Sequence, residues 1–279
     1  ASLWIRIMSG FSSADNWAIY YHNDGFNIKG DRIMGRQAAG WSFLKGVINS
    51  NPKNLGLYIQ DDEQKNIAIN DIKSILKSDQ KIEIDWIPFN QPELSSKFGG
   101  IFFPGPDLNE YSFNRSFHGH DAYSLVGITH TTASYSVINS FRQIETSNLM
   151  PWDAIICTSD SVLDTVNKVI KSNRENLISK GISTSNILPK LPVIPLGIDC
   201  DEFIFSDKEK NAARNKLEIN KDDIVLIFVG RLSFHAKAHH LPMYLALEEA
   251  SRKLDKGKKL HLIQTGWFAN EYIKETFET

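Results

Sequence analysis

The sequence predicts an α/β protein in which helices cover both faces of a parallel sheet. Two observations support this class. Short apolar runs alternate along the chain with longer stretches of helical spacing, as in proteins built of strand–helix–strand units. The short runs are almost wholly apolar, which is typical of parallel strands buried on both faces. At 42% hydrophobic and 23% charged residues, the composition is that of an ordinary globular protein.

The apolar runs and the helical spacing define the predicted elements. The predicted strands are residues 3–9, 55–60, 81–87, 101–104, 125–130, 154–159, 191–197, 224–230 and 260–266. The predicted helices are residues 36–49, 67–77, 134–148, 159–180, 208–217 and 239–256. The loop 88–124 is rich in Pro, Gly, Asn and aromatic residues, which suits either a binding surface or a loop packed onto its own domain.

The predicted domains are residues 1–203 and residues 204–279. The boundary follows "VIPLGIDCDEF", where a run with proline and glycine gives way to a charged helix. The first part supplies about seven strands, enough for a complete sheet. The second supplies a strand, a helix, another strand and the start of a further helix, so we expect this carboxyl-terminal domain to be incomplete.

Charge and hydropathy exclude some classes of function. A formal net charge of −2 gives no overall attraction to nucleic acid. The longest apolar runs are far below the ~20 residues that span a bilayer, and no signal peptide is visible. Two widely separated cysteines fit a reducing compartment. We therefore expect a cytoplasmic protein that binds no nucleic acid, with peripheral association at the inner face of the membrane left open.

The stretch "DIVLIFVGRLSFHAKAHHL" predicts an anion site at a strand end. Gly230 and Arg231 follow the apolar run 224–229, and Lys237 precedes the next predicted helix. Ligands of open parallel sheets bind beyond the carboxyl ends of the strands, and the start of a helix favours anions. A guanidinium and an ammonium there suit a phosphate or diphosphate. The alternative is a pair of solvated cations in a loop.

Four stretches in order resemble the retaining glycosyltransferase family 4 of the GT-B class. They are "WDAIICTSDSVLDTV", "VIPLGIDCDEF" with Leu196 where the family has Asn, "FVGRLSFHAKAHHLPMYLALEEA" with Ala238 where the family has Gly, and "LHLIQTGW", which keeps Gly266. The first 130 residues match only weakly. The resemblance implies a GT-B-like fold, with a Rossmann-like amino-terminal domain on the acceptor side and the beginning of a second, donor-binding Rossmann-like domain.

The resemblance also assigns residues of the donor site. It implies that Arg231 and Lys237 bind the diphosphate of a nucleotide sugar and stabilise charge on the leaving group, so that neither a metal nor a cofactor is required. It places Gly230 and Gly266 in loops around the donor. The family's paired glutamates lie beyond the last residue of this sequence, so we expect this chain to be inactive alone.

Two further residues of the amino-terminal part are candidates. Gly35, in "IMGRQAAGW", matches the second glycine of a family loop that leads into the first helix, although a glycine in an ordinary loop before a helix fits as well. His130 ends the run "LVGITH", where the family often has a histidine that faces the sugar. It is our candidate catalytic residue, and the alternative is a satisfied polar residue under a loop.

The predicted function is transfer of a hexose from a nucleotide-diphosphate sugar to a glycan or lipid-linked acceptor, with retention of configuration. The alternative is a non-catalytic module that binds a glycan or a protein. Asp199 and Asp201 have a spacing that binds metal in another glycosyltransferase architecture, and "HGHD" (118–121) groups two imidazoles, but neither is expected to hold a metal. No G-x-G-x-x-G motif follows a predicted strand, which argues against a dinucleotide-dependent oxidoreductase.

Overall fold

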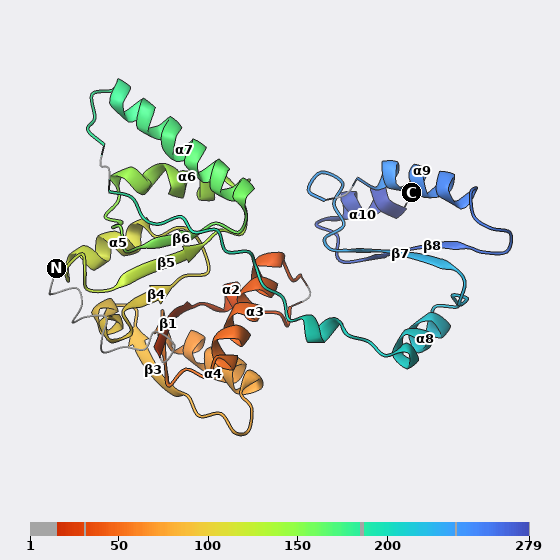
Figure 1. Ribbon diagram of the computed structural model, residues 1–279, viewed down its shortest axis with the longest axis horizontal. Helices are drawn as coiled ribbons and strands as arrows, with labels where there is room; N and C mark the ends of the chain where they lie inside the picture. The colour runs from red at the N-terminus through yellow and green to blue at the C-terminus, as the bar shows by residue number, and fades with distance from the viewer. Residues whose placement is uncertain (1–15, 31, 185–186, 238, 279) are drawn as a thin grey trace. The chain divides into compact units, whose positions relative to one another are not determined.

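The computed structural model describes residues 16–30, 32–184, 187–237 and 239–278 (Figure 1). The chain forms two compact units. The amino-terminal unit comprises Ala1–Lys29 and Gly35–Ile198, and the carboxyl-terminal unit comprises Gly30–Met34 and Asp199–Thr279. The boundary predicted between residues 203 and 204 remains a prediction about independently folding domains.

The amino-terminal unit contains a six-stranded parallel sheet with the order β3-β2-β1-β4-β5-β6. The strands are β1 (Asn16–Tyr21), β2 (Asn54–Ile59), β3 (Glu83–Pro88), β4 (Gly100–Phe102), β5 (Ser124–Ile128) and β6 (Ala154–Ile156). The order reverses at β1, which pairs with β2 on one edge and with β4 on the other. This reversal is the point at which open α/β sheets hold their ligands.

Helices cover both faces of this sheet. They are α2 (Asn23–Phe26), α3 (Gly35–Asn49), α4 (Asp62–Ile75), α5 (Asn109–Ser116), α6 (Tyr135–Gln143) and α7 (Asp160–Ser179), with 3₁₀ turns η1 (Pro92–Phe98) and η2 (Ile144–Thr146). Side chains of α3 and α4 join one apolar cluster, and side chains of α6 and α7 join another. The α/β class with a Rossmann-like parallel sheet is therefore confirmed.

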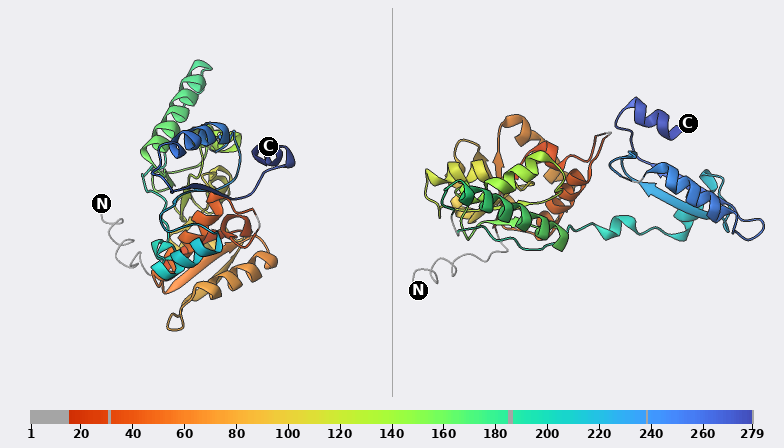
Figure 2. Two further views of the ribbon diagram at one scale, coloured as in Figure 1. Left: turned by 90° about the vertical axis from the view of Figure 1, so that its right-hand side faces the viewer. Right: turned by 90° about the horizontal axis from the view of Figure 1, so that it is seen from above.

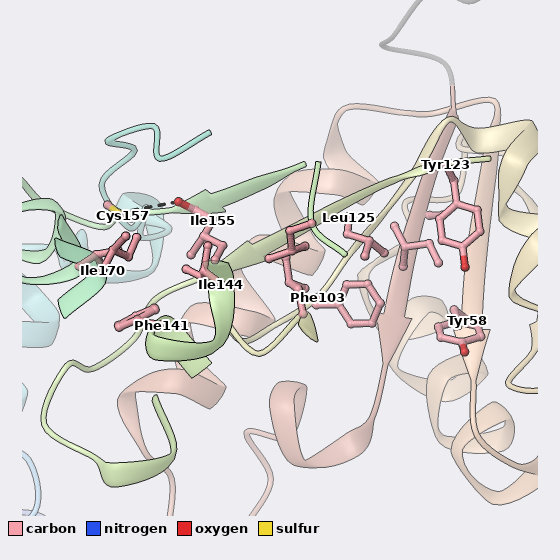
Figure 3. Close-up of a cluster of buried hydrophobic side chains, with 14 of the residues drawn as sticks. Tyr58, Phe103, Tyr123, Leu125, Phe141, Ile144, Ile155, Cys157 and Ile170 are labelled. Atoms are coloured by element: carbon pink, nitrogen blue, oxygen red, sulfur yellow. Dashed lines mark hydrogen bonds between the residues drawn. The ribbon is translucent and has the colours of Figure 1, made fainter. Parts of the chain in front are cut away.

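Figure 3 shows the cluster that α6 and α7 complete. Phe141 and Ile170 from these helices meet Leu125 and Ile155 from the strands, and all four side chains are buried. Cys157 lies in the same cluster and is buried, as its apolar surroundings in the sequence predict. Burial raises the pKa of its thiol, which keeps this cysteine neutral and unreactive.

A buried ion pair lies at the amino ends of β5 and β6. Arg115 of α5 and Asp153, which precedes β6, have fully buried side chains and form two contacts, Nη1–Oδ1 at 2.6 Å and Nη2–Oδ2 at 2.8 Å. The Asp153 carboxylate also accepts hydrogen bonds from the amides of Leu125 and Met150, each at 2.8 Å. Arg115 donates to the carbonyls of Tyr123 and Asn148. One ion pair therefore joins α5 to both strands.

The structure corrects three predictions about this unit. The first described strand, β1, was not predicted, and the predicted strand 3–9 lies outside the described residues. The predicted strand 191–197 is wrong, because the chain there makes an isolated bridge, Cys157 with Val193, and no ladder. Among the described residues the sheet has six strands. The loop 88–124 contains α5, which the periodicity did not indicate.

The carboxyl-terminal unit is a strand–helix–strand unit with flanking helices. It contains η3 (Cys200–Phe203), α8 (Asp207–Lys216), β7 (Ile224–Val229), α9 (His240–Ser251), β8 (Leu260–Thr265) and α10 (Glu271–Glu278). Strands β7 and β8 pair in parallel over six residues each. Helix α9 lies along one face of the two strands (Figure 2), and Tyr244 Oη donates to Gln264 Oε1 across that interface at 2.7 Å.

Within the described part of the chain, no helix has both the length and the apolar character needed to cross a bilayer.

Candidate functional site

Arg231 lies in a short break at the carboxyl ends of β7 and β8. Regular pairing ends at Val229 and Thr265. The Gly230 amide still donates to the Thr265 carbonyl at 3.0 Å, and pairing returns where the Leu232 amide donates to the Trp267 carbonyl, also at 3.0 Å. Arg231 is therefore fixed by backbone hydrogen bonds on both sides, at the edge where a parallel sheet receives its ligand.

Both predicted loop glycines have a structural reason to be glycine. The backbone φ is +145° at Gly230 and +156° at Gly266, a region that residues with a side chain rarely adopt. A Cβ atom at Gly266 would lie 1.7 Å from the Gly230 carbonyl oxygen, whereas one at Gly230 would meet no atom within 4 Å. The two strand ends approach this closely only because Gly266 has no side chain.

The Arg231 side chain is half-buried and lies against an aromatic ring. Its Cζ atom is 5.8 Å from the centre of the Trp267 ring, a cation–π distance. Its Nε atom is buried and has no hydrogen-bond partner among the described residues. Trp267 thus lies beside the guanidinium at the strand ends, and a guanidinium is a forked donor suited to an anion. The sequence predicted the arginine but not the aromatic ring on which it lies.

Lys237 lies in the same connection between β7 and α9. It is exposed, and its amide donates to the Ser233 carbonyl at 3.0 Å in a turn that precedes α9. The helix begins at His240, and the adjacent Ala238 lies outside the described residues. The structure places Arg231 and Lys237 on one loop, and the diphosphate role of both stays a prediction.

The histidines that flank Lys237 have structural partners. His239 is the N-cap of α9, and its Nδ1 atom accepts a hydrogen bond from the Leu241 amide at 3.3 Å. The ring of His240 stacks on that of His239 with centroids 5.1 Å apart, and it lies 4.4 Å from the Phe277 ring. These two rings therefore belong to the aromatic packing between α9 and α10.

In the amino-terminal unit, His130 lies just beyond β5 and is half-buried. Burial lowers the pKa of its imidazole below 6.5, and the nearby Arg36 guanidinium lowers it further, while a hydrogen bond to the Pro104 backbone opposes both effects. The Nδ1 atom is buried and has no partner among the described residues. The ring is therefore mostly neutral at pH 7, and one of its nitrogens is buried without a described partner.

A proton NMR titration of the imidazole resonances tests this environment. We expect His130 to titrate with a midpoint below 6.5, and the midpoint to rise in an Arg36→Gln variant because a like charge is removed. Since the folded pKa lies below the unfolded one, the stability contributed by the neutral ring is lost as pH falls below 6.5. A His130→Gln variant assigns the resonance. A midpoint at or above 6.5 would contradict the burial argument.

At the contact between α2 and α3, the glycine that cannot be replaced is Gly40 rather than Gly35. Gly35 begins α3, and a Cβ atom there would meet nothing within 4 Å, so its predicted role in the loop stays a prediction. A Cβ atom at Gly40 would lie 2.1 Å from the Gly25 carbonyl oxygen, so α2 and α3 can touch only through a glycine. Arg36 forms an ion pair with Asp24, which holds the start of α3 to α2.

The remaining metal candidates do not form a ligand set. Among the residues that the structure describes, no three or more His, Cys, Asp or Glu side chains come together as a metal site. In the "HGHD" segment, His118 Nε2 lies 3.6 Å from the Glu93 carboxylate.

The parallel sheet, its reversal at β1 and the strand-end position of the candidate residues define a GT-B-like α/β fold. Solved structures that share this fold include crystal structures of Anabaena Alr3699/HepE. In complex with UDP, HepE is 14% identical to this chain with a TM-score of 0.54. For the complex with UDP-glucose the sequence identity is 14% and the TM-score is 0.50. For the complex with UDP and glucose the identity is 12% and the TM-score is 0.50.

The match to HepE covers 95% of this chain but 65% of the HepE chain in the UDP complex, and the corresponding shares are 95% and 64% for the UDP-glucose complex. The chain thus spans less than two thirds of the length of the proteins whose fold it shares. No protein-family model matches the sequence. No curated protein matches it either.

Proposed function

We propose that the protein is a glycosyltransferase that uses a nucleotide-diphosphate sugar. The observation that carries this proposal is the GT-B-like fold shared with HepE structures that hold UDP and UDP-glucose. Arg231, within cation–π distance of Trp267 at the strand ends of the carboxyl-terminal unit, supports it, because a diphosphate needs a positioned cation there. On the same grounds we propose UDP as the nucleotide of the donor.

The proposed chemistry needs no metal. Arg231 and Lys237 neutralise the charge that develops on the departing diphosphate, and fixed cations do this without reorganising in the transition state. The neutral imidazole of His130 offers a hydrogen bond to a sugar hydroxyl rather than a charge. A retaining mechanism of family 4 type, a hexosyl donor and a glycan or lipid-linked acceptor complete the proposal, and they rest on the sequence motifs.

Nucleotide binding to wild-type and variant chains tests the donor site. Titrations of UDP, GDP and ADP followed by ligand-observed NMR should show the tightest binding for UDP. Both Arg231→Ala and Lys237→Ala should weaken UDP binding about tenfold, the loss expected for one charge-assisted contact. The matched controls are Arg252→Ala and Lys253→Ala, which remove one cation each from exposed ion pairs near the end of α9. These should leave UDP binding unchanged.

Three outcomes would contradict the proposal. Equal UDP affinity in wild type and in both strand-end variants would remove Arg231 and Lys237 from the site. An equal loss of UDP affinity in the α9 controls would show that the effect comes from the overall charge of the protein and not from contacts at the strand ends. Glycan binding that is indifferent to all four cations, without UDP binding, would favour the non-catalytic module instead.

A further inference from the structure

A groove lies in the amino-terminal unit, at the carboxyl ends of β2 and β3 and the first turn of α4. Its volume is about 550 Å³, enough for one or two sugar rings. The sheet order places β2 and β3 on the outer side of β1, so the groove lies beside the reversal between β1 and β4 rather than at it. None of the candidate donor residues lines it.

The floor of the groove offers one flat apolar surface. The Phe89 side chain, 37% exposed, stacks on the buried Tyr58 with ring centroids 5.2 Å apart and an interplanar angle of 13°. The Tyr58 hydroxyl donates to the Phe89 carbonyl at 2.9 Å, which fixes the backbone of the same residue. The ring is thus held on Tyr58 while more than a third of the side chain stays exposed in the groove lining. The second aromatic residue of the groove, Trp86, has a face covered by Lys65, whose Nζ lies 5.0 Å from the ring centre.

The rim of the groove carries polar side chains with planar amide and carboxylate groups. Gln60 and Asn90 supply side-chain amides, and Asp61 and Asp62 supply carboxylates. All four side chains are exposed. Amides both donate and accept, and carboxylates accept, so together they match neighbouring hydroxyl groups. A rigid aromatic face beside such a rim recognises a ring with an apolar face and a hydroxylated edge, which is the chemistry of a pyranose.

The charges around the groove select among sugars. Asp61 is the N-cap of α4, where one carboxylate oxygen accepts from the Gln64 amide at 2.9 Å, and Asp62 follows it. Lys65 is the one cation that lines the described groove, and its ammonium lies over Trp86. Two carboxylates against one engaged ammonium repel a uronic acid or a diphosphate. The groove therefore suits a neutral glycan and not the nucleotide.

From these observations we propose that the groove at β2 and β3 binds a neutral oligosaccharide segment, with Phe89 as the stacking platform. Its role as a subsite for the glycan acceptor rests on the proposed glycosyltransferase function. The binding itself does not, because the groove is built entirely within the amino-terminal unit.

The test is saturation-transfer NMR on the whole chain with three trisaccharides: cellotriose, maltotriose and tri-galacturonate. We expect transfer to at least one of the two neutral glucose trimers and none to the acidic one. Phe89→Ala should weaken that binding about fivefold or more, since one ring-stacking contact is lost. Asn90→Ala removes a rim amide without touching the aromatic cluster and should also weaken it. The matched control is Phe113→Ala, an aromatic residue of α5 that is 56% exposed and outside the groove.

Each of three results would contradict the proposal that the groove binds a neutral oligosaccharide. They are no transfer to either neutral trimer, equal transfer in wild type, Phe89→Ala and Asn90→Ala, or a loss in Phe113→Ala as large as that in Phe89→Ala. Thermal unfolding of each variant shows whether it still folds. If Phe89→Ala does not fold, the effect of Asn90→Ala, which changes an exposed rim residue, decides whether the groove binds the sugar. A UDP titration of the same samples separates the two proposals, because UDP binding should be unaffected by Phe89→Ala. Sugar binding without UDP binding would retain the groove and reject the donor site.

Discussion

Replacing Asp153 by alanine is expected to destabilise the amino-terminal unit by about 3–5 kcal/mol, the cost of leaving a buried charge without its partner. The Arg115 guanidinium is fully buried, and in Asp153→Ala it would keep only the carbonyls of Tyr123 and Asn148. The amides of Leu125 and Met150 would lose their acceptor as well. Domains are stable by only about 5–15 kcal/mol, so the loss is a large part of the total.

Urea unfolding followed by far-ultraviolet circular dichroism measures this effect. The matched control is Asp164→Ala, which breaks the exposed pair of Asp164 with Lys168 on α7 and should cost less than about 1 kcal/mol. A double variant, Arg115→Met with Asp153→Leu, should recover part of the lost stability, because no unpaired charge remains although the amides of Leu125 and Met150 still lack their acceptor. If Asp153→Ala and Asp164→Ala shift the midpoint equally, the buried pair does not hold α5 to β5 and β6.

Replacing Gly266 by alanine is expected to disrupt the strand ends that hold Arg231, at a cost of about 3 kcal/mol or more. The added Cβ atom would lie 1.7 Å from the Gly230 carbonyl oxygen and 2.7 Å from its carbon. These are backbone atoms of a paired strand, so they cannot rotate away as the tip of a side chain can. We expect loss of UDP binding together with loss of stability.

Hydrogen exchange of β7 and of the following loop measures this change. Protection of the Gly230 and Leu232 amides, which donate to the Thr265 and Trp267 carbonyls, should fall in Gly266→Ala. Gly230→Ala is the comparison, because φ at Gly230 is +145° but no atom lies within 4 Å of an added Cβ. It carries only the backbone strain of about 1–3 kcal/mol. A larger loss of protection in Gly230→Ala than in Gly266→Ala would refute the collision argument.

Most strands of the fold could be predicted because they are short apolar runs bounded by turn residues. Strand β1 was missed although its sequence, "NWAIYY", is rich in strand-favouring aromatic residues, because the more strongly apolar run 3–9 competed with it. The run 191–197 is apolar but carries two prolines, which cannot donate to a ladder. Helix α5 was missed because its sequence, "NEYSFNRS", contains mostly weak helix formers.

The residue types of the candidate site could be predicted from the sequence, but the side chains that they contact could not. Arg231 and the two loop glycines follow from a strand end read in sequence. The cation–π contact of Arg231 with Trp267 depends on the parallel register of β7 and β8, which brings together residues far apart in the chain. Arg115 was missed because a single arginine in a polar segment looks exposed, and only the position of Asp153 directly before a buried strand hinted at a partner.

The central position of β1 in the sheet has a consequence for how the protein folds. Strand β1 pairs with β2 on one edge, but its other partner is β4, in the register Ile19 to Phe102. On a ribosome, β1 would be synthesised long before β4 emerges, so one edge of the strand stays without its partner while β2, β3 and their helices are made. Parallel pairing between such distant segments closes large loops and is slow. The edge of β1 that awaits β4 should therefore be the edge of the sheet that stays unpaired longest during synthesis.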